Sequence, residues 1–326
     1  MVSALLFTCA GLAFAQDPVQ FYAQPPIHII TGPDVNAGGP PPSAETPGSL
    51  ACVYELVKQT KGCPIATSKT LPTGGWGAIA LVDAFDNRQA ANDVKVGPNS
   101  SVSKSIRSRW SSLLASGRCS IQAGPSKSRS ISRWQFQWRR RLRFYLVEAA
   151  SNNNSDQYFA EKVAANLVAK AGGGVISNSW QGGENSTEDQ VGKTYFNHPG
   201  VVYFASSGDG GYNHTGFPAV SPYVVAAGGT QIIRSNGNFQ AEWYWSGGGS
   251  GLSQYESRPP YQDIIKKIVG TKRGVPDFSA VATNVPVYSG SNGVWFVVAG
   301  TSISRHPCLP ASSMLQLARQ SRVARN

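Results

Sequence analysis

The stretch FYLVEAASNNNSDQYFAEKVAANLVAKAGGGVISNS, residues 144–179, determines the expected fold. Its first six and last six residues are short apolar runs of strand length. Ser155-Asp156 is suited to cap a helix between them, and Gly172 is suited to end it. Apolar side chains recur inside at helical spacing: Tyr158, Phe159, Val163, Leu167 and Val168. This order of strand, helix and strand is typical of a parallel sheet covered by helices.

Three further apolar runs extend this pattern, at residues 77–83, 201–205 and 223–227. In α/β sheets, binding and catalysis are found at the carboxyl ends of the strands. Polar and glycine residues gather at the ends expected here: Val82-Asp83, Ser177-Asn178-Ser179-Trp180, Ser206-Ser207-Gly208-Asp209-Gly210 and Val298-Ala299-Gly300-Thr301-Ser302. We therefore predict an α/β fold with a mostly parallel sheet and a functional site at these tips.

The net charge of +11 is concentrated in two windows that contain no acidic residue. Residues 95–144 hold twelve Lys and Arg, and residues 303–326 hold four Arg. The rest of the chain is mildly acidic, so the charge does not mark the whole protein as a binder of nucleic acid. One alternative remains, in which interleaved Trp and Arg of residues 129–143 bind nucleic acid or an anionic membrane surface.

The N-terminus resembles an export signal. Residues 4–15 form an apolar run that ends in Ala13-Phe14-Ala15, a small-residue cleavage pattern, although no Lys or Arg precedes it. We expect a signal peptide at residues 1–15 and a secreted protein without a membrane anchor; the alternative is a buried N-terminal helix. Residues 16–50 are rich in Pro and Gly and are predicted to be an extended linker.

Two of the five cysteines lie close together in a turn-rich stretch outside the basic windows. In an oxidising compartment, Cys52 and Cys63 are expected to close a small disulfide loop, with two free thiols as the alternative. No Cys-x-x-Cys pair or Cys/His cluster indicates zinc.

The tripeptide Gly300-Thr301-Ser302 follows the apolar run 294–299. A serine at such a strand-to-helix turn can expose its hydroxyl and direct its own N–H toward an oxyanion. Alone, the tripeptide is more often an ordinary helix cap. Ser206-Ser207-Gly208-Asp209 adds a polar group on a neighbouring strand tip, where an oxyanion partner is needed. Residues 243–250, WYWSGGGS, are expected to form a substrate-edge loop.

Together these motifs resemble the sedolisins, the serine-carboxyl peptidases of the subtilase superfamily. The resemblance covers residues 51–96 and 144–304, with Ser-Ser-Gly-Asp, Arg-Gly-Val-Pro-Asp and Gly-Thr-Ser in the family's order. It implies a subtilisin-like three-layer fold and a serine-type endopeptidase. Ser302 would be its nucleophile and Asp209 its oxyanion stabiliser. A carboxyl donates a hydrogen bond only when protonated, so such sites work in acid.

One part of the family pattern is missing. A sedolisin also uses a Glu as general base and an Asp four residues later on one helix, so that both carboxyls face the serine. That helix is expected before the strand at 144–149, but residues 97–143 contain no Asp or Glu. The histidines do not replace it, because none lies in the His-Gly-Thr context of ordinary subtilisins: His28, His198, His214 and His306.

The codons of this window permit the missing helix in another reading frame. Joining the last base of each codon to the first two of the next allows Glu-Ile-Ser-Leu-Asp in place of residues 127–131. We predict that residues 97–143, and the tail from 305 onward, are frameshift products. A genuine basic insertion and a divergent family branch are the alternatives. An intact frame on resequencing, with peptides covering residues 134–141, would refute the hypothesis.

The resemblance also sets the expected domain organisation. The peptidase domain covers residues 51–304, interrupted by the aberrant basic segment 97–143 and followed by an aberrant tail, residues 305–326. We expect the fold to be incomplete in its catalytic helix and C-terminal region, and the chain to be marginally stable. The family's calcium site lies beyond the end of this chain, so no metal or other cofactor is expected. No large pro-domain precedes residue 51.

The expected partner is a polypeptide substrate, bound by a monomer with impaired activity or none. A non-catalytic remnant that binds peptides along residues 243–250 is the alternative, besides the basic binder described above. Asp83 has the position of a subtilisin-type triad Asp but is expected to serve a structural or substrate-edge role. Asp277 and Glu242 are expected to accept hydrogen bonds in loops.

Overall fold

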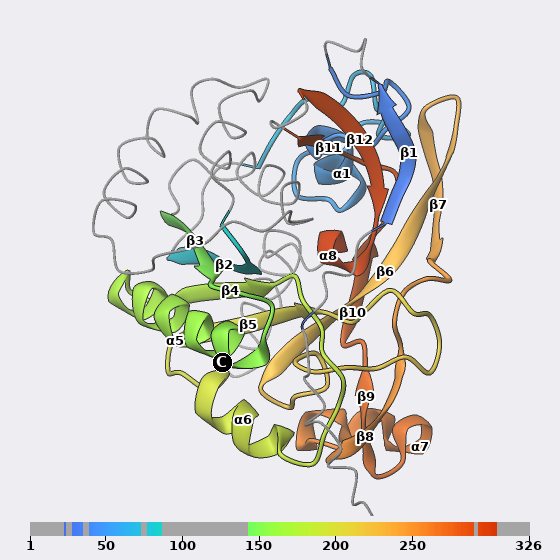
Figure 1. Ribbon diagram of the computed structural model, residues 1–326. Helices are drawn as coiled ribbons and strands as arrows, with labels where there is room; N and C mark the ends of the chain where they lie inside the picture. The colour runs from blue at the N-terminus through green and yellow to red at the C-terminus, as the bar shows by residue number, and fades with distance from the viewer. Residues whose placement is uncertain are drawn as a thin grey trace, which may run out of the picture.

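The computed structural model describes Ala23 and residues 28–34, 39–72, 77–86, 143–289 and 293–304. Its centre is a seven-stranded sheet (Figure 1), in which six strands run parallel in the order β10-β6-β5-β4-β2-β3. β7 pairs antiparallel with β6. The strands are β2 Ala78–Ala84, β3 Arg143–Ala149, β4 Gly174–Asn178, β5 Val201–Ser206, β6 Val224–Ser235, β7 Asn238–Tyr244 and β10 Phe278–Val281.

The predicted α/β fold with a mostly parallel sheet is confirmed. Each of the five apolar runs forms a strand, and these strands are neighbours in the sheet. β2 lies between β3 and β4, and its residues 78–82 are buried because both of its faces are covered. Gly174 begins β4 with a positive φ, and a Cβ there would lie 2.0 Å from the carbonyl oxygen of Ala78. Glycine at the start of this strand therefore permits the pairing with β2.

Two helices cover one face of the sheet (Figure 1). α5, Asn154–Lys170, is the helix expected between β3 and β4, and α6, Glu188–Tyr195, follows β4. Gly172 has a φ of +98° just beyond α5, which fits its predicted role in ending the helix. Aromatic side chains fill the core beneath these helices, in contacts among Tyr158, Trp180, Phe196, Tyr203 and Phe217.

A small antiparallel sheet and a short helix lie on the other side. The sheet has the order β1-β12-β11, with β1 His28–Asp34, β11 Val285–Ser289 and β12 Val294–Ala299. Its apolar residues pack with α1, Pro47–Val53, against β2 and β10. The expectation that residues 294–299 belong to the parallel sheet is therefore wrong. Their pairing with β11 and β1 gives β12 two antiparallel neighbours instead.

Part of the predicted linker is ordered structure. Within residues 16–50, β1 pairs with β12, and α1 begins with Pro47 behind the capping residue Thr46. Glu45, just before the cap, is 1% exposed and pairs with Arg234 of β6 at 2.5 Å. The linker prediction followed the Pro and Gly content, whereas the β12 pairing and this buried ion pair hold these residues in place. The predicted signal peptide, residues 1–15, lies outside the described residues.

The rest of the described chain forms a third, smaller unit at the lower edge in Figure 1. β8, Gly251–Ser257, pairs antiparallel with β9, Lys272–Val275. Between them lie the 3₁₀ helix η2, Pro260–Ile265, and the short helix α7, Lys266–Val269. The short helix α8, Thr301–Ser304, follows β12 and contacts β5, β6 and β10.

The predicted disulfide forms. Cys52 at the end of α1 and Cys63 are bonded, with their Cα atoms 5.5 Å apart. Both side chains are buried. The bridge closes the turn after α1, next to the carbonyl oxygen of Cys63, which accepts a hydrogen bond from Arg234. The bridge and the Arg234–Glu45 pair together fasten the N-terminal region to the long strand β6.

Candidate functional site

The Gly-Thr-Ser turn and the Ser-Ser-Gly-Asp turn meet in the structure. Gly300 leaves β12 and donates its N–H to Ala282 just after β10, at 2.8 Å. Thr301 then lies over the end of β5. Its hydroxyl accepts from the N–H of Gly208 at 3.1 Å and lies 3.0 Å from the carbonyl oxygen of the same residue. These hydrogen bonds hold the Gly-Thr-Ser turn against the Ser-Ser-Gly-Asp turn. The sequence predicted that the two turns lie close together, although β12 belongs to the small antiparallel sheet.

Asp209 is held by Thr301 through one oxygen only. Its Oδ1 accepts from the Thr301 N–H at 2.8 Å and lies 2.9 Å from the Thr301 hydroxyl. Its Oδ2 is buried and has no hydrogen-bond partner among the described residues. Burial raises the pKa of Asp209 above its usual value, while the two Thr301 hydrogen bonds and the nearby His28 act in the opposite direction. The net rise favours the protonated form that an oxyanion donor requires.

Ser302 differs from expectation in its exposure. The side chain is fully buried, and its hydroxyl has no hydrogen-bond partner within the described part of the chain. The prediction that this turn exposes the serine hydroxyl is therefore wrong for this structure. Its position is otherwise as expected, because it directly follows the residue that binds Asp209.

The Glu/Asp helix predicted to activate the serine falls in the window 97–143, which lies outside the described residues except for Arg143, the first residue of β3. Arg129 and most of the basic segment lie outside them as well. Within the described ranges, no carboxylate forms a hydrogen bond with the Ser302 hydroxyl. The structure thus brings together the nucleophile candidate and the oxyanion candidate, without a base beside them in the part that it describes.

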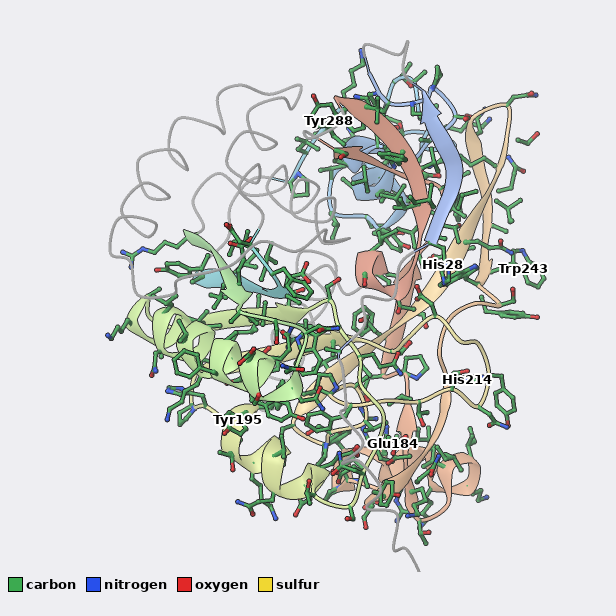
Figure 2. All side chains as sticks on the ribbon, viewed as in Figure 1. His28, Glu184, Tyr195, His214, Trp243 and Tyr288 are labelled. Carbon is green, nitrogen blue, oxygen red and sulfur yellow. A yellow bond between two sulfur atoms is a disulfide. The ribbon has the colours of Figure 1, made fainter. Side chains whose placement is uncertain are left out.

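The glycine-rich loop expected at the substrate edge packs directly behind Asp209. Gly249 donates its N–H to the carbonyl oxygen of Gly208 at 2.6 Å. A Cβ on Gly249 would lie 2.3 Å from the Ser207 oxygen, so a larger residue would push the loop off the strand tip. At the start of the loop, Trp243 and Tyr244 are 60% and 75% exposed. Trp243 is labelled in Figure 2.

Three acidic residues that were assigned no catalytic role occupy structural positions. Asp277 accepts the N–H of Ala226 at 2.7 Å, and Glu242 accepts the hydroxyl of Tyr54 at 2.6 Å, which confirms both as hydrogen-bond acceptors. Asp83 accepts the N–H of Ala84 at 2.9 Å and lies opposite Glu148 in the register of β2 and β3. None of these contacts forms a triad.

His28 was missed as a candidate. Its Nε2 lies 3.6 Å from Oδ2 of Asp209, and its ring packs edge-on against Trp245 with centroids 6.4 Å apart. The sequence held one signal that pointed to it. In His28-Ile29-Ile30, an apolar pair follows the histidine inside a Pro-rich stretch, which is compatible with a short strand. Nothing in the sequence indicated that this strand pairs with β12.

In the described ranges, no group of three or more His, Cys, Asp or Glu side chains is placed to hold a metal ion. Among the same residues, no helix combines the length and the apolar character needed to cross a bilayer.

Comparisons with known proteins point in one direction. No protein-family model matches the chain. Kumamolisin of Bacillus sp. (strain MN-32) is 30% identical over 155 residues, which are 39% of this chain and 28% of kumamolisin. Sedolisin of Pseudomonas sp. (strain 101) is 29% identical over 198 residues, which are 50% of this chain and 32% of sedolisin. The matched region spans less than a third of the length of each relative.

Solved structures share the fold over most of both chains. A structure of Pseudomonas sedolisin, a serine-carboxyl proteinase complexed with two molecules of pseudo-iodotyrostatin, has a TM-score of 0.56 at 18% identity. It matches 85% of this chain and 82% of that one. S41 psychrophilic protease has a TM-score of 0.53 at 15% identity, over 86% of each chain. Sphericase has a TM-score of 0.50 at 15% identity, over 82% of this chain and 83% of that one.

Proposed function

Since the chain is a sedolisin-like protein with a subtilisin-like fold, we propose that it is built as a serine-type endopeptidase that hydrolyses peptide bonds of proteins in acid. The observation that carries the proposal is the contact between the two motif turns. Asp209 accepts the Thr301 N–H at 2.8 Å, directly before Ser302. This contact joins a nucleophile to a carboxyl at the tips of the sheet, where α/β enzymes carry out their chemistry.

Asp209 would stabilise the oxyanion of the tetrahedral intermediate. Thr301 occupies Oδ1 with its N–H, so Oδ2 is the oxygen left to carry the proton. Burial raises the pKa of Asp209, which keeps that proton in place in weak acid. A protonated carboxyl donates a hydrogen bond to the oxyanion, whereas a carboxylate would repel it. Activity through this site is therefore expected to fall as Asp209 ionises.

Ser302 would attack the substrate carbonyl through its Oγ, forming the acyl-enzyme as the peptide C–N bond breaks and the amine leaves. The proton of the hydroxyl must pass to a base. In this chain the helix that supplies the base in sedolisins corresponds to residues 97–143, which contain no Asp or Glu. We therefore propose that this translation is impaired or inactive. From the similarity to sedolisins and the expected signal peptide, we also propose that the protein is secreted and acts on polypeptides as a monomer.

The test compares peptide cleavage by the parent chain with that by Ser302→Ala, at about pH 4, where a raised carboxyl is protonated. Ser304→Ala is the matched control, because Ser304 is also buried on α8 and its hydroxyl donates to the Thr301 carbonyl at 2.9 Å. We expect any cleavage by the parent and by Ser304→Ala to be lost in Ser302→Ala. Measurable and equal rates of cleavage in all three proteins would remove Ser302 from the mechanism.

Trp243 and Tyr244 favour a second function, binding of peptides without cleavage. They are exposed beside the glycine-rich loop and offer aromatic surface to an extended chain. If the parent cleaves nothing, peptide binding by fluorescence titration separates the two cases. Binding that is lost in a Trp243→Ala, Tyr244→Ala double variant supports a peptide-binding remnant, and absence of binding excludes it.

A further inference from the structure

β1 brings a histidine to the candidate site from the far end of the chain. In the antiparallel pairing of β1 with β12, His28 lies opposite Ala299, the residue before the Gly-Thr-Ser turn. The register thus carries the His28 side chain to the tip where Thr301 binds Asp209. Figure 2 shows His28 at this end of β1.

His28 faces the oxygen of Asp209 that Thr301 leaves open. The imidazole Nε2 is 3.6 Å from Oδ2, while both Thr301 contacts go to Oδ1. The Asp209 side chain is 7% exposed, whereas that of His28 is 62% exposed. The imidazole is therefore a solvent-exposed group that lies next to a buried carboxyl.

Trp245 fixes the other side of the imidazole. Its ring meets the His28 ring edge-on, with an angle of 67° between the planes. The backbone of Trp245 is itself anchored, because the backbone N–H of Trp245 donates to the carbonyl oxygen of Gly229 in β6 at 2.9 Å. The β1 backbone and the Trp245 ring together hold the imidazole over Oδ2.

We propose that His28 is a positioning residue for Asp209: the imidazole of His28, placed next to Oδ2, stabilises the carboxylate form and so limits the pH range in which Asp209 can donate a hydrogen bond to an oxyanion. The proposal rests on the function proposed above for Asp209. An imidazole is positively charged in acid, and a positive charge at this distance favours the ionised form of a neighbouring carboxyl. Desolvation, the largest influence on the pKa of Asp209, acts in the other direction, and His28 opposes it.

Among the described residues packed around Asp209, His28 is the group whose charge favours ionisation of the Asp209 carboxyl. β12 and α8 contribute Thr301, which is uncharged, and the glycine-rich loop contributes backbone and Trp245. His214 packs with its ring against Gly210, the residue that follows Asp209. Removing the charge at residue 28 should thus leave Asp209 protonated up to a higher pH.

The test follows the Asp209 carboxyl carbon by NMR in protein labelled at aspartate, with Asp209→Asn identifying its signal. We expect His28→Gln and His28→Ala to raise the titration midpoint of Asp209 by about 0.5 to 1 pH unit, the size typical of a partly solvated charge partner. His28→Lys, which keeps a positive charge, should restore a midpoint near that of the parent. His198→Gln is the control, because His198 is half-buried and its Nδ1 contacts the carbonyl oxygen of its own neighbour Pro199.

An unchanged midpoint in both His28→Gln and His28→Ala would overturn the proposal, as would a rise in His28→Lys equal to theirs. The thermal transition of each variant checks that it folds. Because the His28 side chain is largely exposed, we expect the Gln, Ala and Lys variants all to fold. Hydrolysis is a separate measurement. Where cleavage occurs, its alkaline limit should move with the Asp209 midpoint. If the Asp209 midpoint shifts as expected but Ser302→Ala cleaves peptide as fast as the parent, the proposed peptidase role of Ser302 fails and the His28–Asp209 pairing stands.

Discussion

Replacing Arg273 with methionine should lower the free energy of unfolding by about 3–5 kcal/mol, the usual effect of breaking a buried ion pair from one side. The Arg273 side chain is fully buried. Its Nη1 and Nη2 donate to the two oxygens of Asp277, at 2.8 and 2.6 Å. Without the guanidinium, the Asp277 carboxylate keeps its position in the fold and loses the charge that compensates it.

The pair also holds three elements together. Arg273 belongs to β9, and Asp277 precedes β10. Asp277 Oδ2 accepts the N–H of Ala226 in β6 at 2.7 Å, and the Asp277 N–H donates to the carbonyl oxygen of the same residue at 2.9 Å. Loss of Arg273 should therefore loosen β10, which contacts α8 and the Gly-Thr-Ser turn.

Urea unfolding at constant pH measures the effect, read from the transition midpoint with the slope checked for constancy. Arg258→Met is the matched control, because Arg258 pairs with Asp263 at 2.9 Å but its partner is 61% exposed. A pair of that kind contributes about 0–1 kcal/mol. The double variant Arg273→Met, Asp277→Leu should recover part of the loss. An Arg273→Met protein no less stable than Arg258→Met would contradict the prediction.

The central sheet could be predicted from the sequence because its signals are local. Each strand is a short apolar run, and α5 shows helical spacing between a capping segment and Gly172. The two motif turns were expected to lie close together because parallel strands end on the same edge of a sheet. They do meet, at Asp209 and Thr301, but β12 reaches this edge from the small antiparallel sheet.

The small sheet could not be predicted in the same way. β1 and β12 pair His28 with Ala299, and no periodicity within either segment indicates a partner so distant in sequence. Residues 294–299 were recognised as a strand, but the choice between sheets depends on packing of the whole chain. The β6–β7 hairpin had a local signal that was not used. Asn236-Gly237, both with positive φ, form the kind of two-residue turn that joins antiparallel strands.

The burial of the Ser302 side chain could not be predicted from the Gly-Thr-Ser motif either. Gly-Thr-Ser identifies a turn after a strand, whereas exposure depends on the elements that close over the turn. α8 contacts β5, β6 and β10, and all four of its residues are buried. Sequence motifs therefore predicted which residues meet at the site, and they did not predict how accessible the hydroxyl is.

Stability should be greatest in acid and should fall by on the order of 3–5 kcal/mol as the pH rises from about 5 to about 8, because of buried carboxyls between α6 and β8. Glu188 opens α6 and is 1% exposed, and Glu256 of β8 is 5% exposed. Glu188 Oε2 and Glu256 Oε1 are buried without a hydrogen-bond partner in the described part of the chain. Figure 2 labels Glu184, which lies in the same region.

Glu184 fixes the geometry of this cluster. It accepts hydrogen bonds from the Thr215 hydroxyl, the Ser253 hydroxyl and the N–H of Gln254. The Ser253 hydroxyl in turn accepts from the N–H of Glu256 at 2.9 Å. These bonds satisfy Glu184 as a carboxylate and place its charge close to the other two groups, whose ionisation it opposes.

The pKa values give the sign of the pH dependence. Burial, with the charges of Glu184 and Glu256, raises the pKa of Glu188 from 4.5 to about 8, against the Asn185 N–H that favours ionisation. Burial, with Asp189 and Glu184, raises the pKa of Glu256 to about 7, against Lys193 and Arg273. Between pH 4.5 and these values, the folded chain binds more protons than the unfolded chain. Its stability is therefore complete below the unfolded pKa and is lost as the pH rises through the folded values.

Urea unfolding across this pH range tests the prediction with glutamine in place of the two acids. Glu188→Gln keeps the acceptor for Asn185 and cannot ionise. The double variant Glu188→Gln, Glu256→Gln should therefore depend on pH less steeply than the parent and be more stable than the parent near pH 8. Glu55→Gln is the control, since Glu55 is exposed beyond α1. It should retain the full pH dependence of the parent. A parent stability that is flat or rises toward pH 8, or a double glutamine variant with the same slope as the parent, would show that these carboxyls ionise freely in the folded protein. Either result would remove the acid-stabilised contact between α6 and β8.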